Sequence, residues 1–143
     1  GDKEALFEQA LEYYQKHVIA RMLAPLTQES PSINTLKEFF IQLNVLLKGK
    51  YGAYGCLIQN SQKEGISHNK LVKQVGIDLW KEQHYLFTAC INGPSLKLPY
   101  SLETAVQLLL AQSQSQISLA RSNAPANVLN AQNDAVIALI STW

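Results

Sequence analysis

Apolar residues recur at intervals of three and four along almost the whole chain, and this spacing limits the possible folds more than any other feature. Residues three and four apart share one face of an α-helix, so each periodic stretch predicts an amphipathic helix. The first stretch carries its apolar face at Phe7, Leu11, Tyr14, Val18 and Met22. No stretch alternates between apolar and polar residues over the length of an ordinary β-strand. The sequence therefore predicts an all-α helical bundle.

Glycine and proline fall between the periodic stretches and set the expected helix boundaries. The first helix should run from an N-cap at Asp2 to about Leu23, because Pro25 disfavours helical backbone just before it. The other helices are expected from Ser32 to the glycines that start at Gly49, over 56–63, 68–90 and 101–122, and from Pro125 to the C-terminus. Gly65 should end the short helix, and Asn92-Gly93-Pro94 the long one. We expect about five main helices and a short one, in a single domain over residues 1–143.

Composition narrows the class of protein. Of the 143 residues, 47% are hydrophobic and only 16% are charged, which favours a folded core over a disordered chain. A net charge of +1 does not indicate a nucleic-acid-binding face, which requires clustered basic residues. No apolar run has the length of a membrane span, and no signal peptide is visible. Cys56 and Cys90 lie in apolar contexts and are expected to be reduced and buried, so we expect a cytoplasmic protein with no membrane partner.

The last part of the chain is depleted of charge. Residues 101–143 carry only Glu103, Arg121 and Asp134, although the chain has 12 basic and 11 acidic residues in total. Depletion of charge is typical of the core of an interface, so we expect this helical hairpin to pair with a second copy of the chain. The alternative is a pair of helices buried inside one copy. The expected interface residues are Leu109, Gln112, Gln116, Leu119, Ala120, Val128, Ala131, Ala135 and Leu139.

Catalytic and metal-binding signals are weak. The chain has no glycine-rich phosphate loop, no His-Glu-x-x-His and no Cys-x-x-Cys. The histidines His17, His68 and His84 are far apart, and His84 has no carboxylate partner that the sequence identifies. His84 shares an apolar side of its helix with Trp80 and Phe87, which favours a core or pocket histidine over a catalytic base. We expect no enzyme activity, no metal and no cofactor.

The aromatic and amide residues suit a small-molecule site between helices. Such sites are mostly apolar, with a few polar groups that orient the ligand. The candidate ligand-binding residues are Tyr14, Phe40, Asn44, Tyr54, Cys56, Asn60, Trp80, Gln83, His84 and Phe87. Plain core is the alternative for each aromatic residue. Cys56 precedes a short helix, where a thiol gains nucleophilicity, although a structural buried thiol is the favoured interpretation.

Three segments resemble the tetracycline-repressor-type (TetR-family) transcriptional regulators. Asp2-Lys3-Glu4-Ala5-Leu6-Phe7 is similar to the place where the DNA-reading helix of these regulators passes into the first helix of the regulatory domain. Gly55-Cys56-Leu57-Ile58 is similar to a turn in one large branch of the family, and Leu119-Ala120-Arg121-Ser122 also fits. The resemblance implies a ligand-sensing and dimerisation domain that lacks the N-terminal helix-turn-helix of its parent protein.

The resemblance also implies how such a domain works. Two copies would dimerise through their last two helices as a four-helix bundle. A small effector, whose identity the resemblance does not give, would bind among the first, second and long helices. Binding would shift the first helix and release a repressor from operator DNA, which only the missing N-terminal domain contacts. Some members sense electrophiles or oxidants through cysteines, but here Glu64-Gly65 stands where some relatives carry a second cysteine.

Two other functions stay open from the sequence. One is a stand-alone helical module that binds a small molecule and has no DNA-reading head. The other is a sensor of electrophiles or of redox state that uses Cys56 alone. A helical-bundle enzyme is disfavoured because no acid–base or metal constellation is visible.

Overall fold

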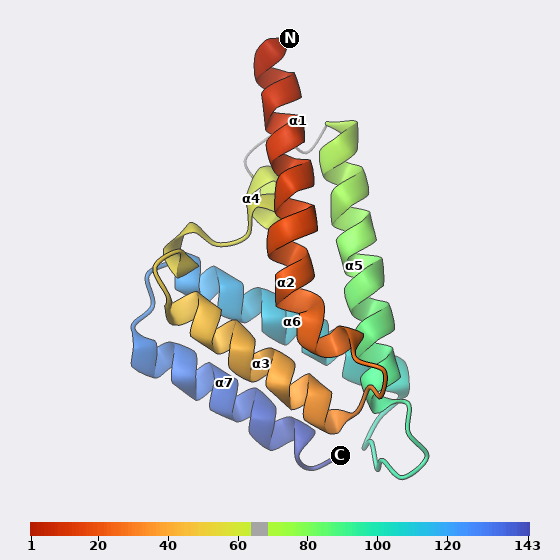
Figure 1. Cartoon of the computed structure of the whole chain (residues 1–143). Helices are drawn as coiled ribbons and strands as arrows, with labels where there is room; N and C mark the ends of the chain where they lie inside the picture. The colour runs from red at the N-terminus through yellow and green to blue at the C-terminus, as the bar shows by residue number, and fades with distance from the viewer. Residues whose placement is uncertain (64–68) are drawn as a thin grey trace.

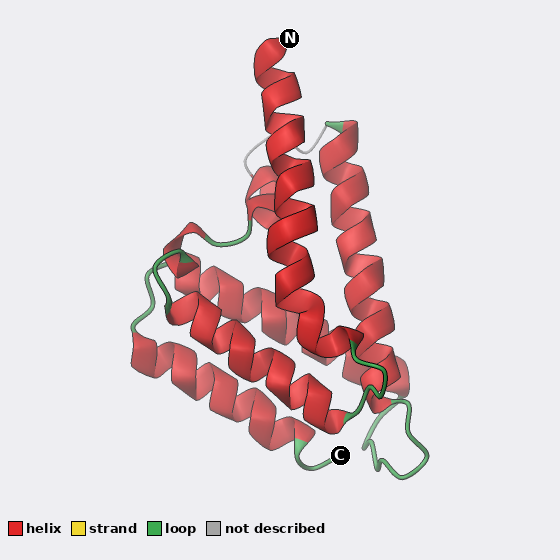
Figure 2. Cartoon of the chain, viewed as in Figure 1, coloured by secondary structure: helices red, strands yellow, loops and turns green. Residues whose placement is uncertain are grey.

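The first helix is a long rod that stands upright beside the rest of the molecule (Figure 1). The computed structural model describes residues 1–63 and 69–143, and every regular element in these ranges is helical (Figure 2). The elements are α1 (Asp2–Tyr14), α2 (Ala20–Leu23), α3 (Ile33–Lys48), α4 (Leu57–Lys63), α5 (Lys70–Ile91), α6 (Leu102–Arg121) and α7 (Ala126–Ile140). The all-α prediction is confirmed. The expected stop at Gly65 and the expected helix start at His68 lie outside the described residues.

A π-helical turn over Gln15–Ile19 joins α1 to α2 without interrupting the rod. The predicted apolar stripe is wrong at Val18, within this turn, because Val18 is 43% exposed whereas Ile19 is only 3% exposed; Met22, after the turn, packs against the core as predicted. In a regular α-helix Leu11 and Ile19 would point about 80° apart, since successive residues turn by roughly 100°. The wider π turn brings both side chains to the same buried face.

Local sequence signals fix most of the other helix ends. The helical backbone ends near Leu23 as expected, in a 3₁₀ turn that contains Pro25. Ser32 opens α3 with a capping box, and Ser101 opens α6 by accepting a hydrogen bond from the Thr104 backbone. The N-terminal end of α1 differs from the prediction, since Asp2 is already helical and its side chain is not the cap.

Two further ends were not expected from the sequence. Asn69 caps α5 through the backbone N–H groups of Leu71 and Val72. Its side-chain amide also donates to a carboxylate oxygen of Glu4, which links the start of α5 to α1. Asn123 ends α6 in a left-handed conformation with φ of 57°, and its backbone N–H donates to the carbonyl of Ala120.

Helix α3 lies at the centre of the fold. It packs against α7, α6 and α5 and against the end of the first rod. In Figure 1, α3, α6 and α7 form one layer, and the rod of α1 and α2 stands across it with α5. Helix α4 packs on α5 and contacts α1. The arrangement leaves α4 above the layer that contains α6.

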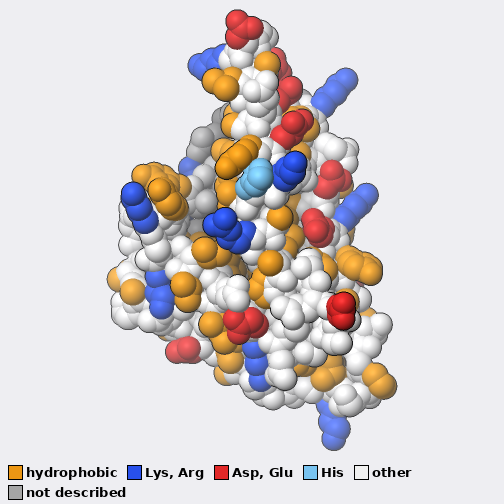
Figure 3. All heavy atoms as spheres, viewed as in Figure 1, with side chains coloured by type: hydrophobic (Ala, Val, Ile, Leu, Met, Phe, Trp, Pro, Cys, Tyr) orange, Lys and Arg blue, Asp and Glu red, His pale blue; other side chains and the backbone are white. Residues whose placement is uncertain are grey.

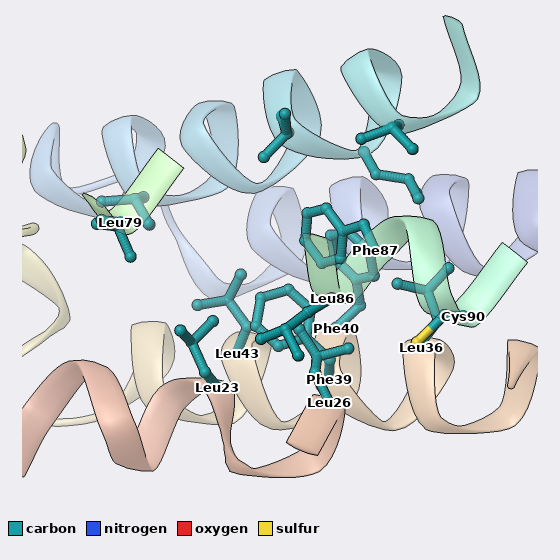
Figure 4. Close-up of a cluster of buried hydrophobic side chains, with 14 of the residues drawn as sticks. Leu23, Leu26, Leu36, Phe39, Phe40, Leu43, Leu79, Leu86, Phe87 and Cys90 are labelled. Atoms are coloured by element: carbon teal, nitrogen blue, oxygen red, sulfur yellow. The ribbon is translucent and has the colours of Figure 1, made fainter. Parts of the chain in front are cut away.

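The core is richest in aromatic contacts between α3 and α5 (Figure 4). The rings of Phe39 and Phe87 meet edge to face at 5.4 Å, and those of Phe40 and Phe87 stack at 6.1 Å. All three side chains are fully buried. Edge-to-face aromatic pairs contribute about 0.5–1.5 kcal/mol beyond the burial of their area. These contacts hold the upright α5 against the layer.

Gly52 provides a test of the packing between α3 and the turn that follows it. A Cβ atom at Gly52 would overlap the backbone carbonyl group of Leu47, which cannot move aside without distorting α3. We expect Gly52→Ala to lower the free energy of unfolding by about 1–3 kcal/mol. Urea denaturation measures this change.

The matched control is Gly93→Ala. Its Cβ would meet only Leu96 at ordinary contact distance, so a change below about 0.5 kcal/mol is expected. Equal urea midpoints for the two variants would contradict the close approach at Gly52.

Candidate functional site

The two phenylalanines predicted to bind a ligand belong to the core. Phe40 and Phe87 have no accessible surface, and each contacts the other and Phe39. A side chain without accessible surface borders no space as large as a water molecule. In this conformation neither ring lines a hollow.

Asn44 and Gln83, also predicted as ligand-binding residues, are buried on different helices. The Asn44 amide donates to the Asn130 side-chain oxygen at 3.0 Å, and the Lys48 ammonium donates to the same oxygen at 2.8 Å. Asn44 therefore joins α3 to α7. Gln83 is only 6% exposed and lies on the buried side of α5.

Trp80 and His84 lie together on the outer side of α5. Trp80 is 44% exposed, so the expected burial of this side of the helix is wrong at Trp80, although Phe87 on the same side is buried. The centroid of the Trp80 ring lies 5.2 Å from that of the His84 ring. His84 Nε2 lies 2.8 Å from Glu103 Oε2 on α6, a partner that sequence reasoning missed. Two hydrogen bonds lower the pKa of the Glu103 carboxyl: the one from Gln107 has the larger effect and the one from His84 the smaller. This exposed pair connects α5 to α6.

Tyr14 and Cys56 come together where the first rod meets the start of α4. Burial raises the pKa of the Tyr14 phenol above its ordinary value of 10.0, the adjacent Cys56 side chain adds to the rise, and a hydrogen bond with the Leu57 backbone opposes it. Cys56 is buried, with 5% of its surface exposed. The π turn begins at the next residue, Gln15. Such turns are frequent at functional sites.

Asn60 and Tyr54 join a neighbouring cluster at the turn before α4. The Asn60 amide donates to the Tyr54 carbonyl at 2.7 Å, and Arg121 donates to the Asn60 side-chain oxygen at 2.6 Å. Gly55 lies between them with φ of 69°, a conformation that favours glycine. The Tyr54 ring itself is 71% exposed. The structure thus brings Tyr14, Cys56 and Asn60 to one region, apart from Phe40 and Phe87.

Cys90, the second cysteine, has a structural environment. Its sulfur lies 3.4 Å from the Thr35 hydroxyl oxygen, and 3% of its surface is exposed. Burial raises the pKa of the Cys90 thiol, and the Thr35 hydrogen bond partly offsets this. A buried thiol of raised pKa is a poor nucleophile at neutral pH.

The residues predicted for a dimer interface divide between the inside and the outside of the chain. Leu109, Gln116 and Ala120 are buried in one copy and cannot touch a second copy in this conformation. Gln112, Leu119 and Val128 are partly exposed, and Ala131, Ala135 and Leu139 are exposed. The surface available to a partner therefore comes from the outer sides of α6 and α7.

Several amide side chains lie inside the layer formed by α3, α6 and α7. Gln112 donates to the Gln132 side-chain oxygen at 3.0 Å, which fixes α6 against α7. Both amide atoms of Gln116, one turn further along α6, are buried without a hydrogen-bond partner, and so is the side-chain oxygen of Asn133 on α7. An unsatisfied buried polar group costs about 1–3 kcal/mol, so these atoms lower the stability of the layer.

An open groove of about 380 Å³ lies between α4 and α6. Its lining residues are Gln59, Gln62, Lys63, Ala111, Gln114, Ser115 and Ser118. A smaller hollow of about 180 Å³ lies where the end of α3 meets the end of α6 and the start of α7. Neither hollow is lined by a residue that the sequence predicted to bind a ligand. The polar α4–α6 groove had no sequence signal, because its two sides are far apart in the chain.

Two further findings concern metals and membranes. Within residues 1–63 and 69–143, no three side chains of His, Cys, Asp or Glu gather as metal ligands would. Among the helices of the same ranges, none combines the length and the hydrophobicity that a membrane span requires.

Comparison with protein-family models, curated proteins and solved structures finds no match to this chain.

Tyr14 gives a test of this region through pH. A phenol with a raised pKa in the folded state stabilises the fold fully below about pH 10, where it is also protonated in the unfolded chain. As the pH rises above 10, the phenol loses its proton in the unfolded chain but keeps it in the folded protein. The unfolded state then binds up to one proton fewer, so the free energy of unfolding falls with pH. We expect the melting temperature to fall less steeply from pH 9 to 11 in Tyr14→Phe than in the unmodified chain.

Tyr85→Phe is the control, because the Tyr85 ring is 71% exposed. Its melting profile should parallel that of the unmodified chain. Parallel profiles for Tyr14→Phe as well would show that the Tyr14 phenol is not buried.

Proposed function

We propose that this chain is the ligand-sensing and homodimerisation domain of a TetR-type transcriptional regulator. The parent protein would be a repressor that binds operator DNA through an N-terminal helix-turn-helix domain and leaves it when a small effector binds. The observation that carries the proposal is the charge-poor outer surface of the α6–α7 pair, on which Asp134 is the one exposed charge in the middle of a helix.

Of the three charges of this helix pair, two lie at the ends of α6 and bond to other elements, and only Asp134 lies in the middle of a helix, where it is exposed. Glu103 lies in the first turn of α6 and pairs with His84, while Arg121 is the last residue of α6 and bonds to Asn60. Asp134 is the one charged residue in the sequence of α7. Charged side chains are abundant elsewhere, and Figure 3 shows acidic and basic groups interspersed along α1 and the visible side of α5. A surface depleted of charge is typical of an interface core.

Small side chains would let a second helix pair approach closely. The exposed apolar residues along the middle of the α6–α7 surface that do not line the α4–α6 groove are Leu108, Ala131, Ala135, Ala138 and Leu139. Alanine permits a short distance between helix axes, and Leu108 and Leu139 supply apolar area to bury. Two copies related by a two-fold axis would place this surface against itself.

The rod of α1 and α2 supports a sensing role. It contacts α4, and Tyr14 lies against Cys56 at the point where the rod turns through its π-helical segment. A ligand that prefers one arrangement of α4 would therefore bias the position of α1. In a repressor of this type, movement of α1 would change the spacing of the two DNA-reading heads.

One other function has a specific observation in its favour. The polar α4–α6 groove could hold a small molecule without any DNA-reading head, as a stand-alone binding module would. A sensor based on Cys56 is less favoured, because only 5% of the cysteine surface is exposed.

The first test of this proposal is the oligomeric state. We expect the chain to sediment as a dimer at micromolar concentration, and Ala135→Arg to sediment as a monomer, because it would leave a charge unpaired in the interface. Ala10→Arg adds the same charge to an exposed position of α1 and should remain dimeric. A monomer for the unmodified chain in analytical ultracentrifugation would sink the dimerisation role.

A second test joins the chain to a helix-turn-helix head that binds its operator only as a dimer. The fusion should repress a reporter gene, with at least a tenfold loss in Ala135→Arg and none in Ala10→Arg, since operator binding depends on two-fold pairing. The chain without the head should not shift operator DNA in a gel, given its net charge of +1. A sequence-specific gel shift by the chain alone would contradict the proposed division of labour.

A further inference from the structure

Polar side chains that have no partner among residues 1–63 and 69–143 line the α4–α6 groove. No hydrogen bond within the described residues engages the side chains of Gln59, Gln62 or Gln114, and no salt bridge engages Lys63. Ser115 and Ser118 line the same groove. Six side chains with hydrogen-bonding capacity thus line one hollow.

Some other glutamines of this chain are held by side-chain partners, whereas the groove glutamines are not. Gln42 bonds to Glu38, Gln74 to Asp78, Gln107 to Glu103, and Gln112 to Gln132. In each of these pairs the amide is held by a side chain on its own or a neighbouring helix. The groove glutamines lack such a side chain, so their amides are available to a bound molecule.

The charge of the groove favours an anion. Among the residues that the structure describes, Lys63 is the one charged lining residue and no carboxylate lines the groove. The sequence of α4, Leu57–Lys63, contains no acidic residue, and the single acid of α6, Glu103, lies at the far end of that helix and bonds to His84. An ammonium and several amide donors without a competing carboxylate fit a carboxylate ligand.

The shape and lining of the groove favour a hydroxylated molecule. Its volume of about 380 Å³ falls within the range of small-molecule sites, roughly 300–1,000 Å³. Amides and serine hydroxyls both donate and accept hydrogen bonds, as sugar hydroxyls do. Among the described lining residues only Ala111 is apolar, so little of the groove suits an aromatic ligand.

We infer that the α4–α6 groove binds a hydroxylated carboxylate of the size of a sugar acid. The Lys63 ammonium holds the carboxylate, and the amides of Gln59, Gln62 and Gln114 bind the hydroxyls together with the two serines. The inference rests on the proposed function only for the role of this molecule as the effector. Binding itself does not depend on a DNA-reading head.

Isothermal titration calorimetry with sodium gluconate as the probe tests the inference. We expect saturable binding with one gluconate per chain, and much weaker binding of glucose, which lacks the carboxylate, and of acetate, which lacks the hydroxyls. Lys63→Gln should weaken gluconate binding about tenfold or more, because it removes a charge-assisted hydrogen bond. Ala111→Trp should abolish binding by filling the groove.

Matched variants control for charge and bulk. Lys73→Gln removes an exposed ammonium from α5, and Ala10→Trp adds an exposed indole to α1, so both should bind gluconate like the unmodified chain. Circular dichroism checks that each variant is folded, and Lys63→Gln keeps the test decisive if Ala111→Trp does not fold.

Three results would overturn the inference. The first is that gluconate shows no saturable binding at millimolar concentration. The second is that Lys63→Gln and Ala111→Trp bind gluconate as the unmodified chain does. The third is that glucose or acetate binds as tightly as gluconate. Sedimentation of the same samples separates this inference from the proposed function. A monomer that binds gluconate refutes the dimeric regulator and keeps the groove site, whereas a dimer that binds none of the probes refutes the groove site alone.

Discussion

The burial of α3 on several sides is the constraint on which the other elements depend. Phe39 and Phe40 project from this helix into the contact with Phe87, so α5 is held by aromatic packing rather than by chain connectivity. With α5 fixed, α4 has a surface to pack on, and the hollow between α4 and α6 follows from that placement. A change that loosens the phenylalanine cluster would therefore alter the groove even though the two share no residue.

Amide pairs set the register of the layer that packs around α3. Asn44 with Asn130 and Gln112 with Gln132 tie α7 to α3 and to α6 at defined levels. Apolar contacts alone are less directional and tolerate sliding, whereas a misplaced amide loses its partner. The unpartnered amide of Gln116 lies in the same layer and shows where this specificity costs stability.

The sequence was sufficient to predict where the helices lie along the chain. It was insufficient to predict which residues of different helices come into contact. Periodicity located the main helices, and Ser32 and Ser101 marked two starts, because these signals are local. The π turn left no local signal, so the predicted stripe continued to Val18. Phe40 and Phe87 are apolar whether they line a pocket or fill a core, and only tertiary packing decides between the two. The pairing of His84 with Glu103 and the two sides of the groove depend on how distant helices cross.

The π turn gives the first rod one residue more than its faces require. Removing one residue from Gln15–Ile19 would leave Leu11 and Ile19 seven positions apart, which an ordinary α-helix already places on nearly the same side. A deletion there would preserve both buried faces, whereas a deletion elsewhere in the rod would rotate one face out of the core. If the π turn formed at another position along the rod, the side chains between the two positions would rotate about the helix axis while both ends stayed in place.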